Sequence, residues 1–256
     1  MITRKDLQDF AGLKGLNLGN AEKDYLIDIA LLSISRRTKN ELVFKGGTCL
    51  YKFYKLNRFS EDIDFSAINN MDTNKFIKKL IMDFGRFGIK AAVHKKKELF
   101  NSILITFRIE GPLYSGNPNT FASLGIDINL KSSIIIEPDV LAYNSNYPEI
   151  PMVSMSCMKE KEIFAEKIRA IMTRKKARDL FDLNFLLEKG THAEKNLLQK
   201  KLHYYNETFD MKRLTERIKI LSGQWEKELR GFTAVLPSFD SVYKNVTEKL
   251  TGLYKE

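Results

Sequence analysis

Scarce cysteine and the lack of a long apolar run narrow the classes of protein that this sequence can encode. Its 256 residues include two cysteines, Cys49 and Cys157, too few for a disulfide framework or a four-cysteine metal site. With 6 prolines and 14 glycines, collagen-like and low-complexity classes are excluded. No stretch approaches the roughly 20 apolar residues that span a bilayer. We therefore expect a globular protein with no membrane association, and the few cysteines favour a reducing, cytoplasmic setting.

Histidine is scarce as well, whereas basic residues are in excess. His94, His192 and His203 are scattered along the chain, which disfavours a histidine metal site. Hydrophobic residues make up 43% of the chain, too many for a disordered protein. Lys and Arg number 42 against 32 Asp and Glu, a net charge of +10. That excess favours polyanionic partners such as nucleotides or nucleic acid, although solvated lysine-rich faces explain it equally well.

The hydrophobic period predicts an α/β (α+β) N-terminal domain over 1–150. Helical spacing covers 1–40, with Asn20 as a helix cap, and 72–87. A further helix is expected to begin at Thr48, after a strand and a tight Gly-Gly turn. Strand-like runs follow at EDIDFS, 89–94, 102–110 and SLGIDINLKS.

The pattern changes after residue 150. Residues 137–151 contain three of the six prolines and are predicted to be a linker. From about residue 159 the period is almost wholly helical, with breaks near Gly190 and Pro237. The predicted second domain is therefore α-helical and covers 151–256.

Two aspartates in EDIDFS point to metal-dependent chemistry. Asp62 and Asp64 are two residues apart, so on a strand both carboxylates project from one face. Like charges that close repel, and a hard cation such as Mg²⁺ offsets the repulsion. If the strand that holds Asp127 lies beside them, three carboxylates converge on a two-metal phosphoryl-transfer site. A lone Asp-x-Asp is more often a solvated strand face.

A glycine pair precedes these acids. Gly46 and Gly47 lack side chains, so backbone can approach a ligand closely there. The helix expected at Thr48 offers free N–H groups and a positive dipole end, which suit a triphosphate. Fourteen residues separate Gly47 from Asp62. A lone Gly-Gly is usually only a turn, but this order places a phosphate site next to a metal site.

The arrangement resembles the signature of the DNA polymerase β-type nucleotidyltransferase superfamily. More narrowly, it is similar to the AbiEii family of nucleotidyltransferase toxins from abortive-infection and type IV toxin–antitoxin systems, which are related to the MenT toxins. The similarity rests on Lys45-Gly46-Gly47-Thr48 together with Arg58-x-Ser60-Glu61-Asp62-Ile63-Asp64-Phe65. It implies a polymerase β-type domain with a mixed sheet flanked by helices. Lys45, Arg58 and Ser60 would then contact nucleotide, or else be a surface charge and loop-shaping residues.

A second motif, in 162–183, resembles the family's later signature. If 161–178 is one helix, Lys167, Arg174 and Arg178 lie within about 20° of one angular position. Such a stripe can contact phosphates, or can be solvated charge with Arg178 and Asp182 as an i,i+4 pair. The resemblance implies that Lys167 holds the triphosphate, that Asp179 orients Lys167 or another basic group, and that Arg174 and Arg178 bind nucleotide.

Together these features predict a nucleotidyltransferase that moves NMP from an NTP to an acceptor hydroxyl. Asp62, Asp64 and Asp127 would bind Mg²⁺, for which Mn²⁺ can substitute, and Gly46, Gly47 and Thr48 the phosphates. The resemblance implies a GTP-type pocket, a tRNA 3′ end as acceptor, and growth arrest or phage defence without a stable antitoxin complex. Two alternatives stay open: a nucleotide- or RNA-binding protein without turnover, and NMP transfer to a protein hydroxyl.

Overall fold

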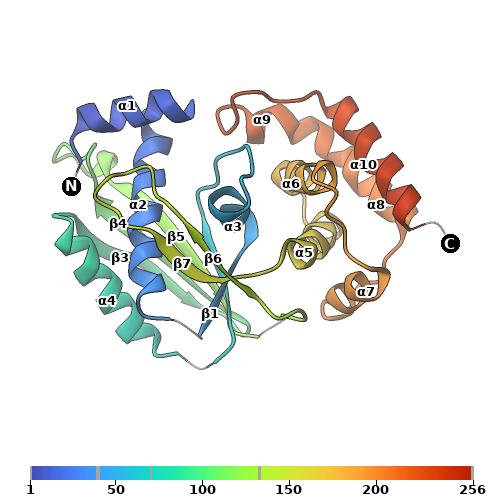
Figure 1. The fold of residues 1–256 in the computed structure, drawn as a ribbon, viewed down its shortest axis with the longest axis horizontal. Helices are drawn as coiled ribbons and strands as arrows, with labels where there is room; N and C mark the ends of the chain where they lie inside the picture. Colours follow the sequence, from blue (N-terminus) through green and yellow to red (C-terminus); the bar gives the residue numbers. More distant parts are fainter. Residues whose placement is uncertain (1, 39–40, 70, 132–133, 255–256) are drawn as a thin grey trace. The chain divides into compact units, whose positions relative to one another are not determined.

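A computed structural model describes residues 2–38, 41–69, 71–131 and 134–254 (Figure 1). Its strands are β1 (Leu42–Lys45), β2 (Ile63–Ala67), β3 (Lys90–Glu98), β4 (Ser102–Glu110), β5 (Ala122–Asn129), β6 (Asp139–Tyr143) and β7 (Val153–Cys157). The α-helices are α1 (Arg4–Lys14), α2 (Leu18–Ser35), α3 (Gly46–Phe53), α4 (Thr73–Arg86), α5 (Glu160–Thr173), α6 (Ala177–Glu188), α7 (Lys195–His203), α8 (Met211–Ile220), α9 (Trp225–Leu229) and α10 (Phe239–Leu253). Two 3₁₀ helices lie at η1 (Pro118–Thr120) and η2 (Leu221–Gln224).

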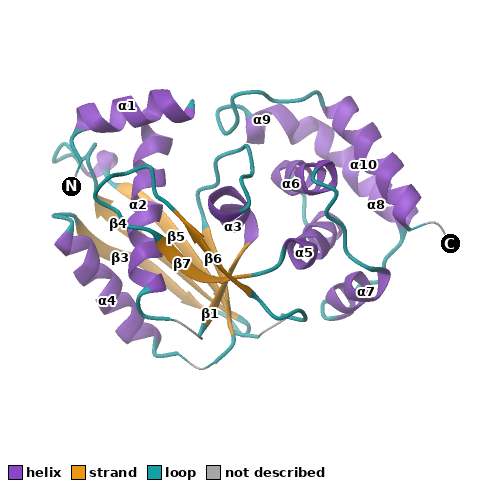
Figure 2. Cartoon of the chain, viewed as in Figure 1, coloured by secondary structure: helices purple, strands orange, loops and turns teal. Residues whose placement is uncertain are grey.

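The seven strands of the described residues form one mixed sheet in the order β3-β4-β5-β2-β1-β7-β6. Figure 2 shows the strands in orange and the helices in purple. The pairs β2–β5 and β1–β7 are parallel, and the other neighbours are antiparallel. Helices flank this sheet, and the chain beyond it is helical. The predicted fold class, a mixed sheet flanked by helices followed by an α-helical region, is therefore confirmed.

Alternation along β5 explains why the sheet has one apolar and one polar face there. Leu124, Ile126 and Ile128 are at most 2% exposed, whereas Gly125 and Asp127 between them are only half-buried. Successive side chains on a strand point to opposite faces. Helix α2 packs against β5, and α4 packs against β3 and α2. Burial of each aliphatic side chain on this side contributes about 1.5–3 kcal/mol.

Two helices begin earlier than the sequence pattern predicts. Asn17, not Asn20, caps α2, and its side chain accepts a hydrogen bond of 2.8 Å from the Asn20 backbone N–H. Helix α3 begins at Gly46 rather than at Thr48. Gly46 has φ +76, a left-handed conformation that glycine adopts without strain, so the strand passes directly into the helix at this residue.

The predicted linker contains a strand. Residues 139–143 form β6, which pairs antiparallel with β7, so the sheet continues to Cys157. The three prolines of 137–151 lie outside β6, where their missing N–H groups do not interrupt the pairing. Strand β3 is also longer than predicted, because a bulge between Val93 and Lys95 lets the pairing with β4 continue to Glu98. Lys95, Lys96 and Lys97 are thus strand residues.

The chain packs as two compact units. The first comprises Met1–Ser132 and Pro138–Cys157, and the second Ser133–Glu137 and Met158–Glu256. Such packing does not test independent folding, so the predicted domains 1–150 and 151–256 stay predictions.

Among the described residues, no helix is both long and apolar enough to cross a membrane. In the second unit, Trp225 is 2% exposed and packs against the rings of Phe181 and Phe239, so it belongs to the core of that unit.

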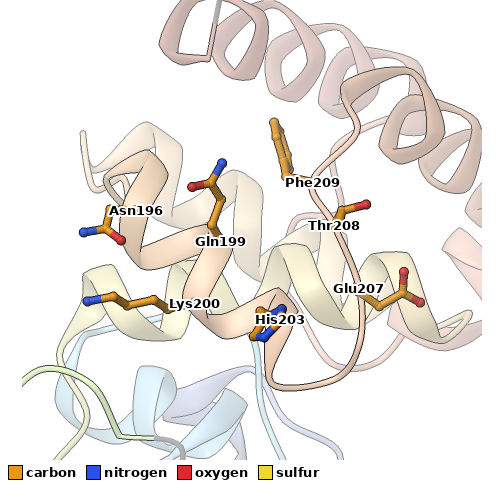
Figure 3. Close-up of a pocket in the computed structure, with 7 residues that line it drawn as sticks. All are labelled: Asn196, Gln199, Lys200, His203, Glu207, Thr208 and Phe209. Atoms are coloured by element: carbon orange, nitrogen blue, oxygen red, sulfur yellow. The ribbon is translucent and has the colours of Figure 1, made fainter.

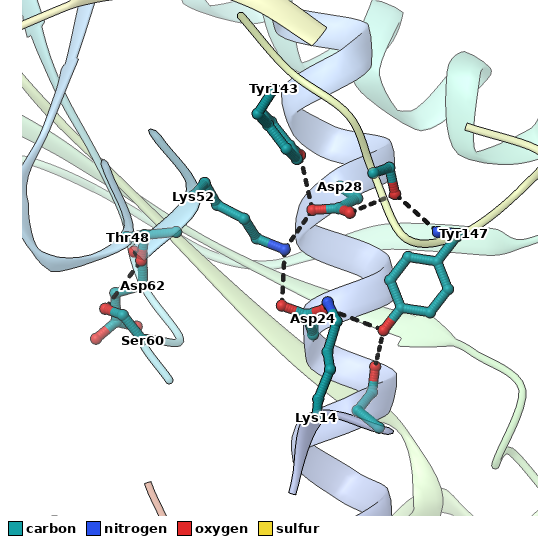
Figure 4. Close-up of polar contacts among 11 residues, drawn as sticks. Lys14, Asp24, Asp28, Thr48, Lys52, Ser60, Asp62, Tyr143 and Tyr147 are labelled. Carbon is teal, nitrogen blue, oxygen red and sulfur yellow. Dashed lines mark hydrogen bonds and ion pairs between the residues drawn. The ribbon is translucent and has the colours of Figure 1, made fainter. Parts of the chain in front are cut away.

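A buried ionic cluster attaches α3 to α2 in the first unit (Figure 4). Lys52 Nζ lies 2.7 Å from Asp24 Oδ1 and 2.5 Å from Asp28 Oδ1. Lys14 also pairs with Asp24. The hydroxyl of Tyr147 donates to Asp24 at 3.0 Å. Burial alone would raise the pKa of Asp24, but attraction to Lys52 and then Lys14 outweighs it and lowers that pKa to about 2.

We predict that Asp24→Asn lowers the free energy of unfolding by about 3 kcal/mol at pH 7, because it leaves buried ammonium groups with too little compensating charge. The ordinary pKa is 3.8 and the folded-state pKa is lower, so the stabilisation is present above about pH 4 and is lost as pH falls through about 2. Urea unfolding at several pH values measures this, with exposed Asp9→Asn as control. Equal stability of Asp24→Asn and wild type at pH 7 would contradict the prediction.

Candidate active site

The strand pairing that the three-aspartate hypothesis requires is present. Strand β5 lies parallel to β2, with Asp127 directly opposite Asp64 and Ile126 opposite Ile63. Directly opposed residues of neighbouring strands share a face of the sheet. Lys45, at the end of β1, is opposite Asp64 on the other side. One row across three strands therefore carries Lys45, Asp64 and Asp127.

Two glycines allow close approach to these acids. A Cβ on Gly46 would lie 2.3 Å from Asp64 Oδ2, so the backbone at the start of α3 comes against the carboxylate where no side chain fits. A Cβ on Gly125 would lie 3.1 Å from Asp62 Oδ1, which places Asp62 on the same face as Asp64 and Asp127. Sequence reasoning missed Gly125. Its signal is a glycine inside an apolar strand, two residues before an acid.

Thr48, Ser60 and Arg58 hold the loop that leads into β2. The buried Thr48 hydroxyl donates to the Asp62 backbone carbonyl and lies 2.9 Å from Ser60 Oγ (Figure 4). Arg58 is 3% exposed, and its Nη1 donates to the Phe59 carbonyl at 2.8 Å. These contacts match the loop-shaping interpretation of Arg58 and Ser60. The predicted phosphate contacts of all three residues stay predictions.

Asp62, Asp64 and Asp127 offer the oxygen ligands that a divalent cation prefers, but their side chains are not arranged as a complete metal-binding group. Asp62 is exposed, Asp64 and Asp127 are half-buried, and Asp127 Oδ1 is buried. Among the described residues, no group of three or more His, Cys, Asp or Glu side chains is placed to hold a metal ion. Carboxylates on one face fit Mg²⁺, which takes one or two of them together with substrate phosphates. Metal binding by these aspartates remains a prediction.

The second motif is not one helix. Helix α5 ends at Thr173, Arg174 is extended with φ −137 and ψ 168, and α6 begins at Ala177. The predicted stripe of Lys167, Arg174 and Arg178 along one helix is therefore wrong. The break is stabilised by a contact distant in sequence, since the first N–H of α6, at Ala177, donates to Glu228 Oε2 at 2.9 Å.

The break brings Lys167 and Arg174 together around one carboxylate. Lys167 Nζ lies 3.0 Å from Asp179 Oδ1 and 2.7 Å from Asp182 Oδ2. Arg174 donates to Asp179 from Nε at 2.7 Å and from Nη2 at 2.9 Å. Burial opposes ionisation of Asp179, but the nearby charge of Lys167 and the hydrogen bond from Arg174 hold its pKa well below the ordinary range.

Asp179 thus contacts the lysine that the sequence motif assigns to it. Lys167 is 6% exposed and Asp182 is buried, so this charge cluster belongs to the interior of the second unit, whereas Arg178 is half-buried. The assignment of Lys167, Arg174 and Arg178 to nucleotide binding, and of Asp179 to catalysis, stays a prediction. Lys167 bridges Asp179 and Asp182 in the interior, so loss of the lysine would leave two buried carboxylates with too little compensating charge.

A cavity of about 420 Å³ lies between α7 and the segment that follows it (Figure 3). It is lined by Asn196, Gln199, Lys200, His203, Glu207, Thr208 and Phe209. None of the predicted site residues is among them, so this cavity is not a part of the candidate site.

Comparison with known proteins identifies relatives. A family model described as nucleotidyl transferase AbiEii toxin, type IV TA system, matches residues 30–245. The solved structure of JHP933 from Helicobacter pylori is similar, with a TM-score of 0.58 at 21% identity over 94% of each chain. The MenT4 nucleotidyltransferase toxin of Mycobacterium tuberculosis H37Rv has a TM-score of 0.64 at 19% identity, over 100% of this chain and 91% of that chain. These structural matches support the fold alone. No curated protein sequence matches this chain.

We predict that Gly46→Ala destabilises the protein more than Gly88→Ala. Both glycines have positive φ, +76 and +72, but a Cβ at Gly88 meets no atom within 4 Å. The control therefore measures the backbone strain, about 1–2 kcal/mol, and the excess loss in Gly46→Ala reports the collision with Asp64. Thermal and urea unfolding measure both variants. Equal losses would show that the Asp64 carboxylate does not lie against Gly46.

Lys167→Met is expected to lower the free energy of unfolding by about 3 kcal/mol, because it leaves Asp179 and Asp182 with too little buried positive charge. Arg174→Gln is the matched comparison, since the Arg174 side chain is 57% exposed and its loss costs less than about 1 kcal/mol. Urea unfolding of both variants measures the difference. A Lys167→Met protein as stable as Arg174→Gln would refute the structural role of the buried pair.

Proposed function

The chain belongs to the AbiEii family of nucleotidyltransferase toxins, and we propose that it transfers NMP from an NTP to a hydroxyl of an RNA acceptor. It is a nucleotidyltransferase, as the motif resemblance indicated, and its family uses an NTP and a divalent metal. The acceptor, the base of the NTP and the use of Mg²⁺ are the parts that we add as a proposal.

One observation carries the proposal. Asp62, Asp64 and Asp127 share a face of the sheet at the point where α3 begins with Gly46. The start of α3 offers backbone N–H groups and the positive end of the helix dipole to phosphates. Acids and phosphate-binding groups thus adjoin within the first unit, as transfer of a nucleotide requires.

The reaction needs positioning and charge neutralisation more than covalent work by the protein. The acceptor oxygen attacks the α-phosphorus, the bond from that phosphorus to the β-phosphate oxygen breaks, and pyrophosphate leaves. Asp127 would take the proton of the attacking hydroxyl. Gly46, Gly47 and Lys45 would contact the β and γ phosphates. Mg²⁺ held by Asp62, Asp64 and Asp127 would supply the positive charge that offsets the developing negative charge.

An RNA acceptor agrees with the charge of the chain, +10, since polyanions bind basic proteins. The family description names a type IV toxin–antitoxin system, so growth arrest or phage defence is the proposed biological outcome. We propose a tRNA 3′ end as the acceptor and a cytoplasmic setting, and we expect the cognate antitoxin to act without forming a stable complex.

We predict that wild-type protein transfers label from an α-labelled NTP to purified tRNA with Mg²⁺, and that Asp62→Asn and Asp64→Asn each reduce the rate at least about a hundredfold. Exposed Asp9→Asn is the control and keeps the wild-type rate. Each of the four NTPs is tried in turn. Sensitivity of the labelled product to RNase or to protease identifies the acceptor.

Three outcomes decide between the hypotheses. Equal labelling by wild type and Asp62→Asn would refute the metal role of the acids. Label in a protease-sensitive band would replace RNA by a protein acceptor. Binding of NTP or RNA with no transfer by the wild type would favour a binding protein without turnover.

A further inference from the structure

The polar face that bears the three aspartates continues onto β4 and β3. Asp127 is opposite Leu104 in β4, and Leu104 is opposite Lys97 in β3. One row to the side, Gly125 is opposite Thr106, and Thr106 is opposite Lys95. Because opposed residues share a face, Lys95 and Lys97 point to the same side of the sheet as the acids.

A third cation follows in the next row. Ser123 of β5 is opposite Arg108 of β4. Rows two residues apart along a strand are separated by about 6.6–6.8 Å. Over β3 and β4 the face therefore presents one cation in each of these three rows, Arg108, Lys95 and Lys97 in order, and the row of Lys97 continues through Leu104 to Asp127. Two strand spacings, about 9.6 Å between backbones, separate Lys97 from Asp127.

This part of the face is open to solvent. Lys95, Lys97 and Arg108 are all exposed. Lys96, between the two lysines, points to the other face: it is opposite the buried Ile105, and its Nζ donates to Asn74 of α4 at 3.1 Å. Helix α4 thus covers the Lys96 side of the strand and not the side of Lys95 and Lys97.

Aromatic rings adjoin the row of Arg108. Phe121, next to β5, stacks on Tyr114 with centroids 4.6 Å apart, and the Arg108 guanidinium lies 5.4 Å from the Phe121 centroid. Proteins that bind single-stranded nucleic acid without sequence preference combine a basic track for phosphates with aromatic side chains on which bases stack. Both elements occur here on one surface.

A polyanionic acceptor must approach a cluster of carboxylates that repels it, so cations on the same face are needed to offset this repulsion. We propose that Arg108, Lys95 and Lys97 bind successive phosphates of a single RNA strand and lead its 3′ hydroxyl to Asp127. The outer strands β3, β4 and β5 are then the acceptor-binding surface. This inference rests on the proposed transfer to RNA and adds where the acceptor binds.

The test compares Lys95→Gln, Lys97→Gln and their double variant with Lys96→Gln, which removes one charge from the other face of the same strand. The probe is a fluorescein-labelled 12-nucleotide single-stranded RNA of mixed sequence with a free 3′ hydroxyl. Anisotropy titration at several salt concentrations gives the Kd. We expect about tenfold weaker binding for the double variant. The slope of log Kd against log salt should fall by about 0.7 for each lysine removed.

Measurements of KM and kcat distinguish a loss of acceptor binding from damage to the catalytic centre. In the labelling assay, the double variant should raise the KM for RNA, while the KM for NTP and the kcat at saturating RNA stay at the wild-type values. Lys96→Gln should match wild type in every measurement.

Equal Kd values for wild type and the double variant would overturn the proposed surface, as would an equal loss in Lys96→Gln, which would indicate bulk charge alone. If wild type labels RNA and the lysine variants do so with an unchanged KM, the inference fails and the proposed function stands. If wild type labels a protein instead, the proposed acceptor itself fails, and this surface is not an RNA path.

Discussion

The pairing of β2 with β5 is the contact on which the candidate site depends. It is parallel and in a register that sets Asp64 opposite Asp127. A shift by one residue would send one of these side chains to the opposite, apolar face of the sheet. The register is maintained because Ile63, Phe65, Ile126 and Ile128 must all remain on the buried side. Burial of apolar side chains thus keeps mutually repelling carboxylates together on the other side.

Buried lysines that each bridge two carboxylates recur in the fold. Lys52 joins Asp24 and Asp28, and Lys167 joins Asp179 and Asp182. Lys201 of α7 likewise lies 2.7 Å from Glu162 and 3.1 Å from Glu166 of α5. Each bridge joins two helices: α3 to α2 through Lys52, α5 to α6 through Lys167, and α7 to α5 through Lys201. Removal of one partner leaves an uncompensated charge, so these contacts favour one arrangement of the helices.

The two faces of the sheet have different roles: one packs into the core, and the other presents charged side chains. On the side of α2 and α4, aliphatic residues of β4 and β5 form the core. On the other side, the same strands present acids near α3 and cations toward the edge strand β3. A period of two residues is enough to produce both, since each strand alternates between the faces. A core and a reactive surface therefore share the same short segments of chain.

Local spacing in the sequence was sufficient for the fold class and for the candidate carboxylates. Asp-x-Asp on an alternating strand places both acids on one face, and the Gly-Gly pair allows a close approach of backbone. The family followed from the order of these motifs. What depended on distant contacts could not be found in this way: the capping of α6 by Glu228, the pairing of β6 with β7 across a proline-rich segment, and the steric need for Gly46 beside Asp64. Periodicity reports on neighbours along one element. Which elements meet, and in which register, is decided by packing of the whole chain, and only the tertiary structure brought Lys95 and Lys97 onto the face of the aspartates.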